Sequence, residues 1–280
     1  MFTYLKSGYR LVKARIMGGR NRLSLPYKIS VRPVNIVIGL LLFLATSFTL
    51  AWPHLPVADA TEYFKFSDVR TLLGIPNAID VISNLAFLFV GLYGIKTLTQ
   101  NKMKWSHPLY LIGLCLSSSA ILTCFGSMYF HWSPNPDSLV WDRIPIVLGF
   151  ASINALMIAD RVDENWGLYS LGTIFILGTL SVIGLNQNWL TLRPYIVVQF
   201  GTILFIFLIL LFVPAKRIGN SIWWATLSLY VIAKILELAD QRILDFTGLI
   251  SGHSAKHLLA AMAMYKILSA FHNTAQAKSQ

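Results

Sequence analysis

Residues 193–213 read RPYIVVQFGTILFIFLILLFV, and no charged residue follows Arg193 in this stretch. A continuous apolar run of roughly 18 residues or more is long enough to cross the hydrocarbon core of a bilayer as an α-helix. A helix satisfies all of its backbone polar groups internally, which lipid requires. The run therefore predicts a transmembrane helix.

The composition of the whole chain agrees with this prediction. Of its 280 residues, 55% are hydrophobic and only 12% are charged. Soluble domains carry about 25% charged residues because their surface faces water. Lipid is therefore expected to cover much of the surface, and we predict an all-α, polytopic integral membrane protein.

The remaining apolar runs are separated by short polar loops, with prolines at or near many of the breaks. Together with the run above they predict eight spans, near residues 34–52, 77–97, 108–131, 139–159, 167–186, 193–213, 221–240 and 254–272. No soluble domain, low-complexity linker or strong internal repeat interrupts this pattern.

Much of the net charge of +11 comes from the stretch before the first span. Eight of the 23 basic residues lie there without an acidic neighbour: Lys6, Arg10, Lys13, Arg15, Arg20, Arg22, Lys28 and Arg32. A basic arm beside a membrane helix is typical of an orientation signal that contacts anionic lipid headgroups. We therefore expect anionic headgroups, and not nucleic acid, as the partner of this arm.

The loops predict the orientation. The first loop carries Asp59, Glu62 and Asp68, whereas basic residues lie in the second loop, the sixth loop and the tail: Lys102, Lys104, Lys216, Arg217 and Lys278. Basic loops face the cytoplasm in most membrane proteins. With eight spans, this asymmetry places both termini in the cytoplasm.

Ionisable residues inside the spans gather at one predicted depth. Ser127 and His131 lie four residues apart near the end of the third span, and Asp142 enters the fourth span eleven residues after His131. His253 and His257 lie one turn apart at the start of the last span. With the predicted topology, the three histidines and Asp142 fall near the non-cytoplasmic ends of their helices. Such residues are costly in a membrane and usually mark a functional site.

The three histidines predict a zinc centre. Three neutral imidazoles with a fourth position left for water are typical of catalytic zinc, and the bound water becomes a nucleophile near neutral pH. Asp142 would orient that water and accept its proton, and Ser127 would donate to the water or to the oxyanion. The simpler alternative is that each histidine makes an ordinary polar contact, but their common depth favours the metal site.

Other polar residues have simpler interpretations. Lys234 and Glu237, three residues apart, are expected to pair within a helix. Asp240 lies at a helix end, where a solvated or structural role is expected. The group Asp80, Ser83 and Asn84 lies at a helix start, where capping is the usual role, although a place near the pocket stays open.

The order Ser127-x-x-x-His131, Asp142, His253-x-x-x-His257 resembles the CREST superfamily of membrane hydrolases. The greatest similarity is to the alkaline ceramidases and their bacterial relatives. Residues 75–84 (IPNAIDVISN) and 251–258 (SGHSAKHL) are similar to the openings of the first and last core helices of that family.

The resemblance covers about residues 60–272 and implies a seven-helix hydrolase core there. Residues 34–52 would then be an extra helix, preceded by the cytoplasmic arm 1–33, and residues 273–280 a short cytoplasmic tail. By the same resemblance, His131, His253 and His257 would hold zinc, while Ser127 and Asp142 would flank its water.

The activity that the resemblance implies is hydrolysis of a lipid amide, with ceramide or a ceramide-like membrane lipid as substrate and a fatty acid and a long-chain amine as products. The alternative is a lipid-sensing receptor in which the same zinc is structural. A transporter is disfavoured, because paired broken helices with central charges are absent from the sequence pattern.

The sequence departs from the family pattern at the residues that bind calcium in eukaryotic ceramidases. Eukaryotic ceramidases bind it through an Asp-Trp-x-Glu segment and a glutamate that opens the first core helix; here the segment is absent and Asn77 stands at the glutamate position. Oxygen ligands could come from Asp59, Glu62, Asp68 and Asp80. Without the family pattern, we do not predict a calcium site.

Overall fold

The computed structural model describes residue 35, residues 64–186 and residues 193–277. The predicted basic arm 1–33, nearly all of the predicted first span 34–52 and the last three residues of the tail lie outside the described residues. The fold below is that of the described helices alone.

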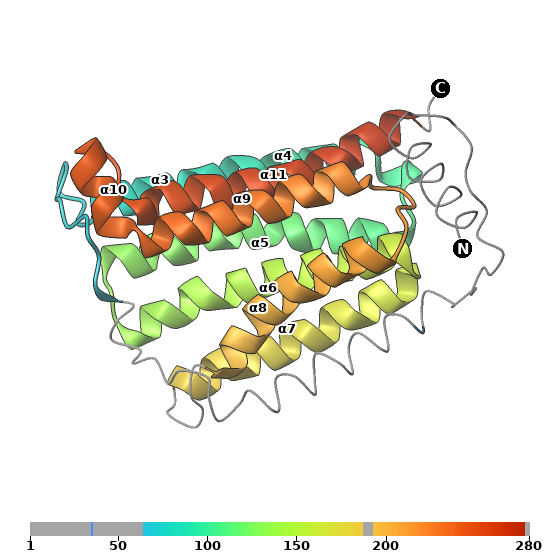
Figure 1. The fold of residues 1–280 in the computed structure, drawn as a ribbon, viewed down its shortest axis with the longest axis horizontal. Helices are drawn as coiled ribbons and strands as arrows, with labels where there is room; N and C mark the ends of the chain where they lie inside the picture. The colour runs from blue at the N-terminus through green and yellow to red at the C-terminus, as the bar shows by residue number, and fades with distance from the viewer. Residues whose placement is uncertain (1–34, 36–63, 187–192, 278–280) are drawn as a thin grey trace, which may run out of the picture. The chain divides into compact units, whose positions relative to one another are not determined.

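The described part of the chain is helical and contains no β-strand apart from an isolated bridge between Leu72 and Ile75. Its elements are α3 (Ala78–Ser83), α4 (Leu85–Gln100), η3 (Lys102–Lys104), α5 (His107–Trp132), α6 (Pro136–Arg161), α7 (Glu164–Asn186), α8 (Arg193–Phe212), α9 (Asn220–Leu238), α10 (Asp240–Thr247) and α11 (Gly252–Ala277) (Figure 1). The prediction of an all-α fold is confirmed for these residues.

Six stretches are long and apolar enough to cross a membrane: Ala78–Gln100, His107–Trp132, Pro136–Arg161, Glu164–Asn186, Tyr195–Phe212 and Asn220–Leu238. They indicate insertion into a membrane and correspond to six of the eight predicted spans. The predicted span 254–272 lies within α11, which is not among the six. Polar residues in its first turns, including His253, Lys256 and His257, lower its hydropathy.

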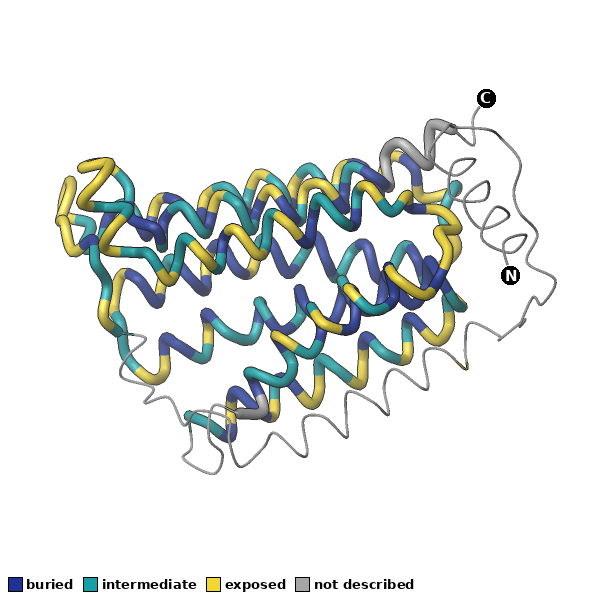
Figure 2. The backbone as a smooth tube through the Cα atoms, viewed as in Figure 1, coloured by how far each residue is buried: buried dark blue, intermediate teal, exposed yellow. Residues whose placement is uncertain are grey.

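The helices form a ring. Neighbouring pairs around it are α4 and α5, α5 and α6, α6 and α8, α8 and α9, α9 and α11, and α11 and α4. Helix α7 packs on the outside, mainly against α6. Large apolar side chains such as Phe125, Leu177 and Phe212 are exposed, and Figure 2 shows exposed positions recurring along most of the helices. Lipid would cover such side chains in a membrane.

Two glycines bring ring helices into close contact at the end where the predicted site lies. A Cβ atom at Gly126 of α5 would lie 2.1 Å from the carbonyl oxygen of Trp141 in α6. A Cβ atom at Gly252 of α11 would lie 2.0 Å from the carbonyl oxygen of Leu236 in α9. Only glycine allows these backbone approaches, as is common where membrane helices cross.

The start of α6 is set by a capping box. The Asn135 side chain accepts a hydrogen bond from the Ser138 backbone amide at 2.9 Å, and the Ser138 hydroxyl accepts one from the Asn135 amide at 3.0 Å. Pro136 occupies the first turn, where its missing N–H costs nothing. This cap fixes where α6 begins, and with it the position of Asp142 two turns later.

The predicted span 221–240 ends earlier than expected. Helix α9 stops at Leu238, and the chain continues after Ala239 as the separate short helix α10, which ends at Thr247 and is followed by the C-cap Gly248 with a φ of 63°. The carboxylate of Asp240, in the first turn of α10, accepts a hydrogen bond from the backbone of α11. The residue that follows the break thus contacts the start of α11.

Candidate metal centre

The three predicted ligands come together from two helices. His131 lies in the last turn of α5, and His253 and His257 lie in the first two turns of α11. One ring nitrogen from each lies within 4.8 Å of the other two. The Nε2 atoms of His131 and His253 are 3.3 Å apart. A group with this spacing can hold a metal ion.

The contacts of the histidine rings are compatible with metal binding. Nδ1 of His257 lies 2.7 Å from the hydroxyl of Ser83, which leaves Nε2 for a ligand bond. A metal-binding imidazole commonly has such a partner on its other nitrogen. Nδ1 of His131 is buried and has no hydrogen-bond partner among the described residues. Three nitrogen donors are also a typical zinc ligand set, so the residues fit a metal ion.

Ser127 and Asp142, predicted to be catalytic, line the same cavity as the three histidines. Ser127 lies one turn before His131 on α5, and both side chains are buried. Asp142 projects from α6 and lies 3.5 Å from the guanidinium of Arg143. The structure thus brings all five predicted site residues to one cavity wall.

The cavity has a volume of about 160 Å³ and lies inside the ring of helices. Its polar end carries the histidines with Asp142, Arg143, Lys234, Glu237 and Lys256. The rest of the wall is mainly apolar and includes Phe150, Ile153, Ile206, Leu227 and Met264. Such a cavity suits an amphiphilic molecule with its polar group beside the histidines.

Lys256 is a site residue that the sequence reasoning missed. Its ammonium lies 2.8 Å from a Glu237 carboxylate oxygen and 3.0 Å from Nε2 of His253. Lys234 and Glu237 pair within α9 as predicted, but both also face the cavity. The position of Lys256 between His253 and His257 in the sequence could have indicated that it lies at the site. Its contact with Glu237 on α9 could not be predicted from sequence spacing.

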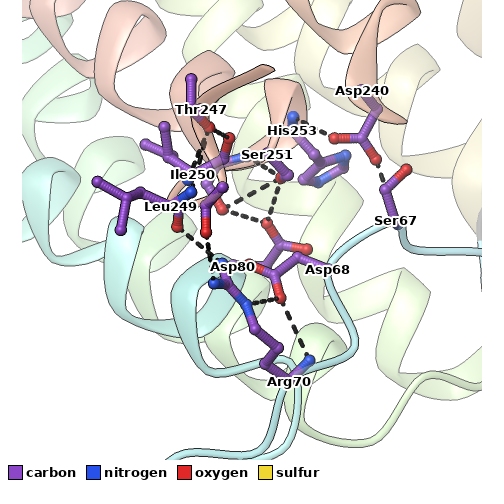
Figure 3. A network of polar contacts seen from close by, with 12 residues as sticks. Ser67, Asp68, Arg70, Asp80, Asp240, Thr247, Leu249, Ile250, Ser251 and His253 are labelled. Atoms are coloured by element: carbon purple, nitrogen blue, oxygen red, sulfur yellow. Dashed lines mark hydrogen bonds and ion pairs between the residues drawn. The ribbon is translucent and has the colours of Figure 1, made fainter. Parts of the chain in front are cut away.

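The capping interpretation of Asp80, Ser83 and Asn84 is wrong. Neither α3 nor α4 has a side-chain cap hydrogen bond. Asp80 instead accepts hydrogen bonds from the hydroxyls of Ser251 and Ser254, at 3.2 Å for Ser251 (Figure 3). Asp80 and Ser83 of α3 thus hold the start of α11 and the ring of His257 in place.

Asp240 takes the structural role expected of it. One of its oxygens accepts a hydrogen bond from the backbone amide of His253 at 2.7 Å, and the other accepts from the amide of Ser67 at 3.3 Å (Figure 3). A carboxylate at a helix N-terminus satisfies an otherwise unpaired amide and interacts favourably with the helix dipole. Asp240 therefore fixes the turn of α11 that carries His253.

Asp68, one of the candidate oxygen ligands for calcium, is paired with Arg70. Arg70 donates to Asp68 from Nε at 2.7 Å and also binds the carbonyl oxygens of Gly248 and Leu249 (Figure 3). The hydrogen bond from Arg70 holds the pKa of Asp68 below its ordinary value. Asp68 is thereby engaged by a protein cation, and Asp59 and Glu62 lie outside the described residues.

No family model, curated protein or solved structure matches this chain. The resemblance to the CREST hydrolases accordingly stays a prediction from the motif residues. The function has to be inferred from the cavity and the side chains that line it.

Proposed function

We propose that this protein is a zinc-dependent membrane hydrolase that cleaves a lipid amide, with ceramide or a ceramide-like lipid as the substrate class. The observation that carries the proposal is the group of three histidines within 4.8 Å at the polar end of a mainly apolar cavity. The motif resemblance to the alkaline ceramidases of the CREST superfamily supports the same reaction.

His131, His253 and His257 would hold the zinc ion. When bound, zinc polarises a carbonyl oxygen and lowers the pKa of a water molecule toward neutrality. Ser83 contributes by holding Nδ1 of His257, which sets the orientation of the ring. Asp240 contributes by holding the first turn of α11.

Asp142 is the proposed general base, because it is a buried carboxylate on the cavity wall shared with the histidines. Arg143 lies 3.5 Å from this carboxylate and would hold its orientation. Ser127 is the proposed donor to the oxyanion that forms when the amide carbonyl is attacked. The proton that Asp142 accepts would pass to the leaving amine, which gives a free fatty acid and a long-chain amine.

The proposal also includes the number of membrane spans and their orientation. Seven spans from α3–α4 to α11 would form the hydrolase core, and residues 34–52 would add one span before it. Both termini would then lie in the cytoplasm, with arm 1–33 on anionic headgroups and the histidines toward the non-cytoplasmic side. The apolar cavity wall would receive the acyl chain of the lipid.

The test uses the purified full chain in detergent. We expect about one zinc ion per chain by elemental analysis, and release of labelled fatty acid from ceramides of several chain lengths. Release should stop on chelation and return on addition of zinc, without a requirement for calcium. A protein that carries zinc and binds lipid but cleaves no amide or ester in a broad panel would be a lipid-sensing receptor, contrary to our proposal.

A further inference from the structure

The polar end of the cavity carries more basic than acidic side chains. Lys234 and Lys256 share a single carboxylate, that of Glu237, with Lys256 at 2.8 Å. Among the described residues, no second carboxylate lies within ion-pair distance of either lysine. One carboxylate neutralises one ammonium, so this pair of lysines leaves a surplus positive charge.

The remaining charges of the cavity wall do not remove the surplus. Arg143 lies against Asp142 and also donates to the Tyr195 hydroxyl at 3.0 Å, so the Asp142 carboxylate already has a basic neighbour. The side chains of Lys234, Glu237 and Lys256 are 28%, 26% and 19% exposed, and all three line the cavity. An unbalanced charge at membrane depth is costly and indicates a ligand or a pathway.

The surplus charge lies beside the candidate metal centre. The Lys256 ammonium is 3.0 Å from Nε2 of His253. This Nε2 atom of His253 lies 3.3 Å from Nε2 of His131. An acidic group bound by the lysines would therefore lie close to a carbonyl at the histidines. In an amide lipid, this position corresponds to a substituent only a few bonds from the amide nitrogen.

We propose that the cavity recognises an acidic amide lipid, an N-acyl compound with a carboxylate or phosphate next to the amide, and that Lys234 and Lys256 bind the acidic group. This inference rests on the proposed function, the hydrolysis of a lipid amide, and specifies an acidic amide lipid as the preferred ligand over ceramide, which is neutral. The apolar wall around Phe150, Ile206 and Met264 would hold the acyl chain. A small free anion would leave that wall without a partner, so a lipid is the expected ligand.

The test compares two lipids that differ in one group. N-palmitoylglycine and N-palmitoylethanolamine have the same chain and amide, but the first ends in a carboxylate and the second in a hydroxymethyl group. Equilibrium binding of each radiolabelled lipid is measured with the full chain in neutral-lipid nanodiscs. Because hydrogen bonds to a charged group are stronger than those to a neutral group, we expect at least about tenfold tighter binding of N-palmitoylglycine.

Substitutions test whether the two lysines cause the preference for the acidic lipid. Lys234→Gln and Lys256→Gln should each reduce the preference for N-palmitoylglycine severalfold while the binding of N-palmitoylethanolamine stays unchanged. Lys266→Gln is the matched control, because Lys266 is an exposed lysine on α11 away from the cavity wall. Zinc content is measured for Lys256→Gln, so that a loss of metal is not mistaken for a loss of the acidic ligand.

The outcomes separate this inference from the proposed function. Equal binding of the two lipids, or competition by glycine or inorganic phosphate as strong as by N-palmitoylglycine, would overturn the acidic-lipid site. Hydrolysis of ceramide without a charge preference would overturn it too, while the hydrolase proposal stands. A lysine-dependent preference without any hydrolysis would support the site and count against the hydrolase.

Discussion

The hydroxyl of Ser83 lies 2.7 Å from Nδ1 of His257, although 174 positions separate the two residues in the chain. The contact joins the short helix α3 to the first turns of α11, where two of the three candidate ligands lie. It makes Ser83 the partner of a candidate ligand ring and not a helix cap.

We expect Ser83→Ala to weaken zinc binding about 10- to 100-fold, because partners of metal ligands have effects of this size. The fold should persist, since the change removes one hydroxyl. Competition with a chromophoric chelator measures the affinity. Ser228→Ala, at an exposed serine on α9, serves as control. Unchanged affinity in Ser83→Ala would show that this contact does not support the metal.

Removal of a ligand should have a larger effect. We expect His131→Ala, His253→Ala and His257→Ala each to lose most of the bound zinc, because a site with three protein ligands tolerates the loss of one poorly. Elemental analysis of the purified variants measures this. His107→Ala, at an exposed histidine at the start of α5, should keep its zinc. Full occupancy in all three ligand variants would rule out the assignment.

The proposed base can be tested without changing its shape. Asp142→Asn removes the proton acceptor and should lower the turnover of labelled ceramide by about two to four orders of magnitude while zinc stays bound. Ser127→Ala should lower it by about two to three orders through loss of an oxyanion donor. Turnover and zinc content are measured on the same preparation. Wild-type turnover in Asp142→Asn would refute the mechanism, and a structural zinc site would show no such dependence.

The close approach of α5 and α6 predicts a change in stability. A Cβ at Gly126 would lie 2.1 Å from the carbonyl oxygen of Trp141, so Gly126→Ala must push the two backbones apart. We expect it to lower the free energy of unfolding by about 1–3 kcal/mol.

The matched control is Gly172→Ala on α7, where nothing lies within 4 Å of an added Cβ. It should be neutral or raise the free energy of unfolding by about 0.5–1 kcal/mol, because alanine favours a helix over glycine. Unfolding of both variants in mixed detergent micelles measures the difference. Equal stability of the two variants would contradict the tight crossing.

Local sequence patterns determined most of the helices. The predicted span 108–131 corresponds to α5 at His107–Trp132, and the predicted span 167–186 to α7 at Glu164–Asn186. Length and hydropathy of a run are local properties, and an apolar run in lipid has few alternatives to a helix. The pairing of Lys234 with Glu237 was predictable for the same reason, since helical spacing alone brings such side chains together.

Only the tertiary structure decided what surrounds the histidines. Lys256 meets Glu237 because α11 crosses α9 at Gly252, and Ser83 meets His257 because α3 packs against α11. Contacts of this kind depend on which helix faces are neighbours around the ring. No spacing within a single helix contains that information. The motif predicted the three histidines, and the packing of the helices around the ring places them beside a basic cavity wall.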